Sequence, residues 1–186
     1  MSNKPELSVV VCFKDWGLER LEGVTKSIQA SGLGDRVEVV IADYGSEHPE
    51  GYRESLETLG AKYFYFETDG IWSRSRALNL GIREARGTYV VTTDSDMVFT
   101  PGTFPRILEL LRSTENSYFI VQCRDLPEGI KHQDIENGVF SWDQLESVSR
   151  LRPRWGMGGL IAFSMDAYVE LRGLDERLHT YGGGGH

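Results

Sequence analysis

Apolar residues occur along the chain in short continuous runs that alternate with longer segments of helical spacing. Residues 7–13 are apolar except for Ser8, which is typical of a strand buried on both faces of a parallel sheet. From Leu18 to Ile28 the apolar residues recur at helical spacing, which predicts a helix with one buried face. The same alternation predicts strands at 37–42, 61–66 and 88–93, and helices at 49–59 and 74–85. Such strand–helix repeats predict a parallel sheet with right-handed crossovers.

The pattern is weaker in the second half of the chain. Helices are predicted at 104–111, capped by Thr103, and at 166–171, and strands at 117–123 and 160–164. Residues 124–150 are polar and lack periodicity, so we expect a long irregular loop, which in a compact domain is usually functional or mobile. No internal repeat is visible. We therefore expect a single α/β domain with a mostly parallel sheet flanked by helices.

The composition excludes several classes of protein. The chain has 186 residues, 40% of them hydrophobic, which suits one globular domain with a sizeable core. Its net charge of -8 argues against general nucleic-acid binding, because that function needs a basic face. No apolar stretch approaches the ~18–20 residues of a transmembrane segment, and the first residues do not form a signal peptide. We expect a cytoplasmic protein, or one peripheral to the inner face of a membrane, with Cys12 and Cys123 as buried reduced thiols.

Two acidic residues follow the strand predicted at 88–93. Asp94 and Asp96, separated by Ser95, are expected at the carboxyl edge of the sheet, where α/β proteins bind their ligands. Two neighbouring carboxylates repel each other, and a divalent cation such as Mn²⁺ or Mg²⁺ relieves the repulsion through hard oxygen ligands. The cation would in turn hold a diphosphate. The alternative is that one acid caps the next segment and the other is solvated. No glycine-rich dinucleotide or Walker-type loop offers another phosphate site.

Four blocks of sequence, in order, resemble the GT-A-fold glycosyltransferases, especially the family-2-like group with its polysaccharide polymerases and galactosyltransferase relatives. Residues 8–13 resemble the opening strand, and residues 40–46 resemble the block that contacts the nucleotide base. Residues 76–96 contain an Asn-x-Gly helix followed by Asp-Ser-Asp, which is similar to the metal-binding motif of these enzymes. Residues 158–176 resemble the later block on the acceptor side.

The resemblance implies a Rossmann-like GT-A fold and a metal-dependent transfer of a sugar, with inversion, from a nucleotide diphosphosugar to a glycan or other hydroxyl acceptor. A UDP-sugar is the expected donor. Asp94 and Asp96 would bind Mn²⁺ or Mg²⁺, and Arg76, or Arg74 in its place, would clamp the phosphates. Donor contacts are expected from Asp43, Tyr44, Arg76, Asn79, Asp94, Ser95, Gly158 and Gly159. For Asn79 a buried hydrogen bond between helix and sheet is an equal alternative.

The chain departs from the family pattern in two places. Tyr44 stands where the second of two acids often follows Asp43, and its ring would stack on the base instead. Gly184 and Gly185 stand where a Glu-Asp pair usually supplies the catalytic base, which leaves Asp175 and Glu176 as weaker candidates. We expect residues 1–181 to form the donor-binding domain and residues 182–186 to be a linker or tag remnant, or a truncation scar.

Two other functions stay open at this point. A sugar-phosphate nucleotidyltransferase would normally carry a glycine-rich basic loop after its first strand, whereas residues 14–17 read Lys-Asp-Trp-Gly. A non-catalytic nucleotide-sugar-binding or scaffold protein of the same shape is favoured by the missing Glu-Asp pair. The sequence does not identify the sugar, the acceptor or the linkage. Retention or inversion also stays open, because the acid that would decide it is missing.

Overall fold

The computed structural model describes residues 4–115, 117–153 and 159–177. Within them a six-stranded sheet has the order β3-β2-β1-β4-β8-β5. Its strands are β1 (Leu7–Phe13), β2 (Val37–Tyr44), β3 (Lys62–Phe66), β4 (Tyr89–Asp94), β5 (Tyr118–Ile120) and β8 (Leu160–Ser164). The first four are parallel, and β8 runs antiparallel to both β4 and β5. The predicted mostly parallel sheet is therefore confirmed.

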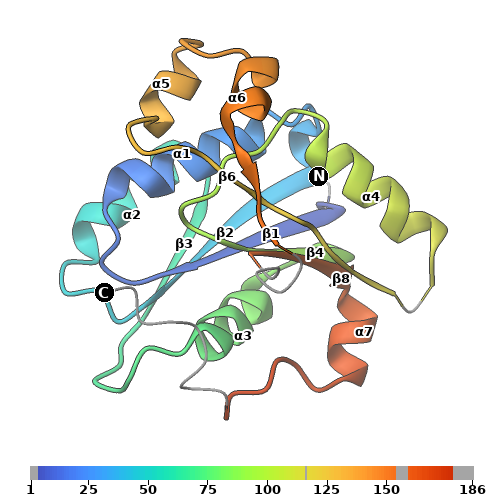
Figure 1. Ribbon diagram of the computed structural model, residues 1–186. Helices are drawn as coiled ribbons and strands as arrows, with labels where there is room; N and C mark the ends of the chain where they lie inside the picture. The colour runs from blue at the N-terminus through green and yellow to red at the C-terminus, as the bar shows by residue number, and fades with distance from the viewer. Residues whose placement is uncertain (1–3, 116, 154–158, 178–186) are drawn as a thin grey trace.

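Helices cover both faces of the sheet (Figure 1). One face carries α1 (Leu18–Gln29), α2 (Glu50–Thr58) and α4 (Thr103–Ser113), and the other carries α3 (Arg74–Glu84) and α7 (Met165–Glu170). Strand β1 contributes side chains to the apolar cores on both faces of the sheet, because successive side chains point to opposite faces. Val9 and Val11 pack beneath α1 and α4, whereas Val10 and Cys12 pack against α3. The continuous apolar run in the sequence reflects this burial on both faces.

Strand register brings the predicted site residues to one edge. Phe13 pairs with Asp43 of β2, and Cys12 pairs with Asp94 of β4, so the carboxyl ends of the three strands lie together. Helix α3 approaches the sheet closely beside them. A Cβ atom at Gly81 would lie 2.6 Å from Val10 Cγ1, so the glycine of the Asn-Leu-Gly sequence is required for this packing.

The boundaries of β2 and α4 differ from prediction, whereas the cap of α3 does not. β2 continues through Asp43 and Tyr44, which we expected in a turn, because both pair with β3. Thr103 is the first residue of α4 and not its cap; its hydroxyl lies 2.8 Å from that of Thr100. The expected cap of α3 is confirmed, since Ser73 Oγ accepts a hydrogen bond from the Arg76 amide at 3.4 Å.

The segment expected to be an irregular loop is largely ordered. A short ribbon joins β6 (Arg124–Asp125) to β7 (Arg150–Leu151), and between them lie α5 (His132–Glu136) and α6 (Trp142–Val148). These helices are too short to produce a readable periodicity. They are held by contacts with the domain and by a capping box in which Ser141 and Gln144 exchange side-chain to backbone hydrogen bonds.

Helix α5 is docked on α1. A Cβ atom at Gly23 would lie 2.3 Å from His132 Nδ1, so the absence of a side chain at position 23 admits the imidazole. An ion pair of 2.9 Å joins Lys26 of α1 to Glu136 of α5. The segment that carries α5 and α6 therefore lies beside α1, as Figure 1 shows.

The two cysteines lie where the sequence analysis placed them. Cys12 and Cys123 are both buried and unpaired, as predicted. Within the described ranges, no helix is both long enough and apolar enough to cross a bilayer.

Candidate active site

The two acids of the Asp-Ser-Asp sequence lie in different surroundings. Asp94 ends β4 and is half-buried, and its Oδ1 accepts a hydrogen bond from Arg74 Nε at 2.7 Å. Its backbone amide donates to the Gly159 carbonyl oxygen at 3.3 Å, which ties β4 to the start of β8. Ser95 is buried, and Asp96 is exposed in the turn that follows. Asp94 is thus fixed, while Asp96 faces the solvent.

The charges around Asp94 explain its electrostatics. Burial raises the pKa of Asp94, the Arg74 guanidinium opposes that rise, and the neighbouring Asp96 carboxylate adds to it. Arg74 is the first residue of α3, and the Ser73 cap fixes the start of that helix. Because Arg74 lies twenty residues before Asp94, their contact depends on how α3 packs on the sheet.

The carboxylates at this edge are of the type that a hard divalent cation prefers. Among the described residues, no group of three or more His, Cys, Asp or Glu side chains gathers around one point. Arg74 already donates a hydrogen bond to Asp94 Oδ1. Among the described residues, none forms a hydrogen bond or ion pair with the Asp96 side chain. Of the two acids, Asp96 is therefore the one whose carboxylate is available to such a cation.

Asp43 is buried at the end of β2 and holds the turn that follows. Its Oδ1 accepts from the Ser46 amide at 3.0 Å, and its Oδ2 accepts from the Tyr63 hydroxyl. Burial raises the pKa of Asp43, although the bonds from Tyr63 and Ser46 act in the opposite direction. Burial, together with the hydrogen bond to Asp43, raises the pKa of the Tyr63 hydroxyl. No sequence pattern points to Tyr63, since only the pairing of β2 with β3 brings it to Asp43.

The loops that follow β1 and β2 are joined to each other. Asp15 donates its backbone amide to Ser46 Oγ at 3.0 Å and accepts from the Glu47 amide at 2.9 Å. Tyr44 is buried beside this junction, with its ring centroid 6.0 Å from that of Trp72. Tyr44 therefore forms part of the core beneath the site.

Asn79 and Arg76 face the segment after α7. Asn79 is buried, and its amide bonds the Leu174 backbone, the Tyr168 hydroxyl and Glu176. Arg76 is exposed, with its Nε 3.9 Å from Glu176 Oε2. The weaker base candidates are both engaged, Glu176 in these contacts and Asp175 in an ion pair of 2.8 Å with Arg177. The alternative role for Asn79 needs correcting in one respect: its bonds join α3 to this segment and not to a sheet strand.

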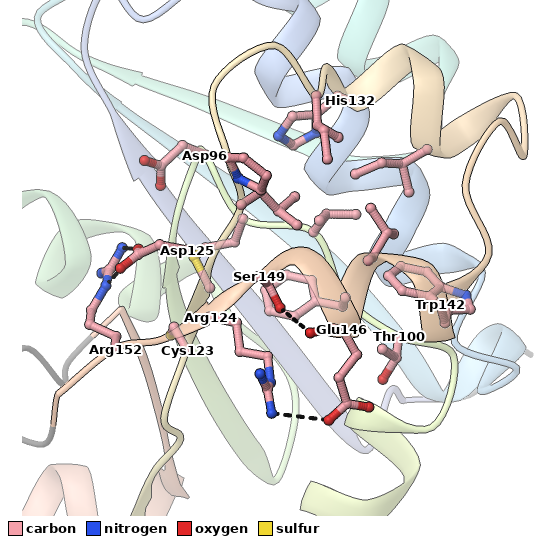
Figure 2. Close-up of a pocket in the computed structure, with 18 of the residues that line it drawn as sticks. Asp96, Thr100, Cys123, Arg124, Asp125, His132, Trp142, Glu146, Ser149 and Arg152 are labelled. Carbon is pink, nitrogen blue, oxygen red and sulfur yellow. Dashed lines mark hydrogen bonds and ion pairs between the residues drawn. The ribbon is translucent and has the colours of Figure 1, made fainter.

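A pocket of about 800 Å³ opens beside Asp96 (Figure 2). It lies between the turn after β4 and the segment that carries α5 and α6. Asp96, Asp125 and Arg152 lie at one end, and Trp142 and Glu146 at the other, as the figure shows. Of these five residues, the sequence analysis identified only Asp96.

Several predicted site residues lie outside the described residues. These are Gly158, Gly184 and Gly185, together with Trp155, a further candidate for stacking, and the whole of the expected terminal linker at 182–186. Gly159 is described: a Cβ atom there would lie 3.4 Å from Asp94 Oδ2 and 3.5 Å from Cys123 Sγ. Gly159 therefore leaves space directly beside Asp94.

The chain matches a known protein family in sequence and several solved structures in fold. A family model described as Glycosyl transferase family 2 matches residues 8–154. The mannosyltransferase PcManGT from Pyrobaculum calidifontis, solved in complex with GDP-Man and Mn²⁺, has a TM-score of 0.62 and 21% identity, over 94% of this chain and 48% of that chain.

Two structures of S. aureus TarS 1-349 are also similar. The complex with UDP has a TM-score of 0.67 and 14% identity, over 95% of this chain and 52% of that one. The complex with UDP-GlcNAc has a TM-score of 0.55 and 16% identity, over 67% of this chain and 36% of that one. The chain spans about half the length, or less, of these proteins. At such identities the likeness shows a shared fold.

Proposed function

Because this chain belongs to glycosyl transferase family 2 and has the GT-A fold, we propose that it binds a nucleotide diphosphosugar at the carboxyl edge of β1, β2 and β4. The sugar is transferred to a hydroxyl acceptor. The observation that carries this proposal is the pair of acids at the end of β4, one fixed by Arg74 and the other exposed. A β-strand terminus at this edge is where ligands bind in α/β sheets.

Asp96 is the main protein ligand for Mn²⁺ or Mg²⁺ in this proposal, and Asp94 the second. The bound cation supplies Lewis-acid stabilisation of the diphosphate as it becomes the leaving group. Arg74 orients Asp94 and brings a positive charge to the phosphate side of the site, where a charge-assisted bond to an oxyanion is strong. Arg76 lies two residues further along α3 and its Nε is 3.9 Å from Glu176 Oε2, so Arg74 is the better placed phosphate contact.

UDP is the proposed nucleotide. TarS was solved with UDP and with UDP-GlcNAc, whereas PcManGT was solved with GDP-Man, so both nucleotides belong in the test. Tyr63 and Ser46 already donate hydrogen bonds to the two carboxylate oxygens of Asp43. In this proposal Asp43 therefore positions the turn that contacts the nucleotide base and does not itself contact the base. The expected stacking of Tyr44 is replaced in this proposal by a supporting role in the core.

The proposed reaction inverts the anomeric centre. The acceptor oxygen bonds to the sugar carbon as the bond from that carbon to the diphosphate breaks, and a carboxylate takes the hydroxyl proton. Release of nucleotide from UDP-GlcNAc, UDP-glucose, UDP-galactose and GDP-mannose, each with MnCl₂, tests the proposal. We expect release from a UDP-sugar that is lost in Asp96→Asn and retained in Asp35→Asn, an exposed acid far from the site. Release from none of the four, or equal release by both variants, would refute it.

A further inference from the structure

The pocket beside Asp96 adjoins the proposed donor site. Its volume of about 800 Å³ falls within the ~300–1,000 Å³ range of ligand pockets. One wall comes from the turn after β4, including Met97 and Phe99, and the opposite wall from α6, including Trp142 and Leu145. Both walls belong to ordered elements, so the pocket does not depend on closure of a loop.

The pocket shares Asp96 with the proposed donor site. The Asp96 side chain lines it, and Cys123, another lining residue, lies against Gly159 and so close to Asp94. A molecule in this pocket would therefore place one end beside the proposed diphosphate and cation. Such a position suits the molecule that receives the sugar.

Two ion pairs lie along the walls. Arg124 meets Glu146 at 3.0 Å, and Arg152 Nε donates to Asp125 Oδ1 at 2.9 Å. Each pair presents guanidinium donors next to carboxylate acceptors. A sugar hydroxyl both donates and accepts, so it can use both members of such a pair. Trp142, which remains 37% exposed at the other end, offers a flat apolar face on which the C–H face of a sugar ring can pack.

The charge of the lining also bears on the class of ligand. Six carboxylate side chains and four Lys or Arg side chains line the pocket. A phosphorylated lipid or another polyanion requires an excess of cationic groups, which this lining does not provide. The balance of charges favours a neutral ligand rich in hydroxyl groups.

We propose that this pocket binds the acceptor and that the acceptor is a neutral saccharide, packed on Trp142 with the receiving hydroxyl directed toward Asp96. The proposal rests on the proposed function, since it assigns the second substrate of the same reaction. It names Trp142 and Glu146 as residues that select the acceptor and have no part in holding the donor.

Saturation-transfer NMR on the whole chain with defined probes tests this proposal. The probes are N,N′-diacetylchitobiose, lactose and maltose, with farnesyl phosphate and a Ser/Thr-containing heptapeptide as other acceptor classes. At least one disaccharide is expected to bind, and Trp142→Ala is expected to weaken it at least tenfold. Glu146→Gln, which keeps the size of the side chain, should weaken the same ligand and serves if Trp142→Ala unfolds. Val148→Ala, on the same helix but outside the lining, is the matched control and should bind as the parent does.

Three results would overturn the proposal. They are no binding by any disaccharide, disaccharide binding that neither pocket variant changes, and farnesyl phosphate or the peptide as the probe that these variants affect. Binding of UDP with MnCl₂ is measured on the same protein. If UDP binds and the disaccharides do not, only the acceptor assignment fails; if UDP does not bind either, the proposed function fails with it.

Discussion

Asn79 pairs with the backbone of Leu174 through two hydrogen bonds, with Nδ2 donating to the carbonyl oxygen and Oδ1 accepting from the amide, each at 2.9 Å. The same side chain accepts from the Tyr168 hydroxyl at 2.8 Å and donates to Glu176 Oε1 at 2.9 Å. One buried amide thus fixes the segment after α7 to α3, the helix that supplies Arg74 to Asp94. Gly173 completes the junction, since a Cβ atom there would lie 3.1 Å from Asn79 Oδ1.

Asn79→Ala is expected to destabilise the domain by about 2–4 kcal/mol, because it leaves several buried partners without hydrogen bonds. Urea unfolding followed by circular dichroism measures the loss. Asn137→Ala, at the exposed end of α5, is the control and should change the free energy of unfolding by less than about 0.5 kcal/mol. Equal stability of the Asn79 variant and the parent would show that the junction contributes nothing.

Glu38 makes stability depend on pH. Burial alone would raise the pKa of Glu38, but hydrogen bonds from Lys62, Ser8 and the Arg86 amide outweigh burial and hold it below its usual value near 4.5. A lowered pKa contributes stability above the unfolded value, and that contribution is lost as pH falls through the folded value. Glu38→Gln should therefore cost about 1–3 kcal/mol at pH 7.

The cost of Glu38→Gln should shrink as the pH falls below about 4.5, because the parent then protonates the same carboxylate. Urea unfolding of both proteins between pH 3 and pH 8 measures the difference. A difference that is constant over this range would contradict the linkage. Glu57→Gln, an exposed acid in an i,i+4 pair with Arg53, should show almost no difference at any pH.

Both cysteines should resist thiol reagents in the folded protein. Burial raises the pKa of Cys12 to about 12 and also raises that of Cys123, so almost no thiolate forms at pH 8. A colorimetric disulfide reagent should label neither thiol within minutes under native conditions and both in urea. Rapid native labelling of Cys123 would show that the pocket exposes its sulfur.

Gly23 determines how α5 docks on α1. Gly→Ala in a helix normally gains about 1 kcal/mol, but a methyl group at position 23 would collide with the His132 ring and Cβ. Gly23→Ala is therefore expected to destabilise by about 1–2 kcal/mol. The double variant with His132→Ala should recover that loss relative to His132→Ala alone, as measured by thermal unfolding. Stabilisation by Gly23→Ala in the parent background would mean that α5 is not held against α1.

The sequence was most informative where elements were long and periodic. The strands of the parallel sheet, α1 and α3 came close to their observed bounds because buried faces impose a regular spacing on them. The segment 124–150 was wrongly expected to be irregular, since α5 and α6 are too short for any period and depend on contacts with α1 and on the capping box of α6. Short elements held by tertiary contacts leave little local signal.

The sequence predicted where the candidate active site lies, but not which residues contact its acids. The acids at the end of β4 were found from sequence, because a strand terminus fixes their edge of the sheet. The partners of Asp94 and Asp43 were not, since Arg74 and Tyr63 reach them only through the packing of α3 and the pairing of β3. The pocket residue Trp142 had no signal at all, because nothing near it in sequence relates it to Asp96.

We propose that Asp96 binds a cation that in turn binds a nucleotide diphosphate. Isothermal titration calorimetry of UDP into the chain, with and without MnCl₂, tests it directly. We expect UDP to bind at least tenfold more tightly with Mn²⁺, and the Mn²⁺ effect to disappear in Asp96→Asn while persisting in Asp35→Asn. Equal UDP affinity with and without Mn²⁺, or an unchanged Mn²⁺ effect in Asp96→Asn, would contradict the claim.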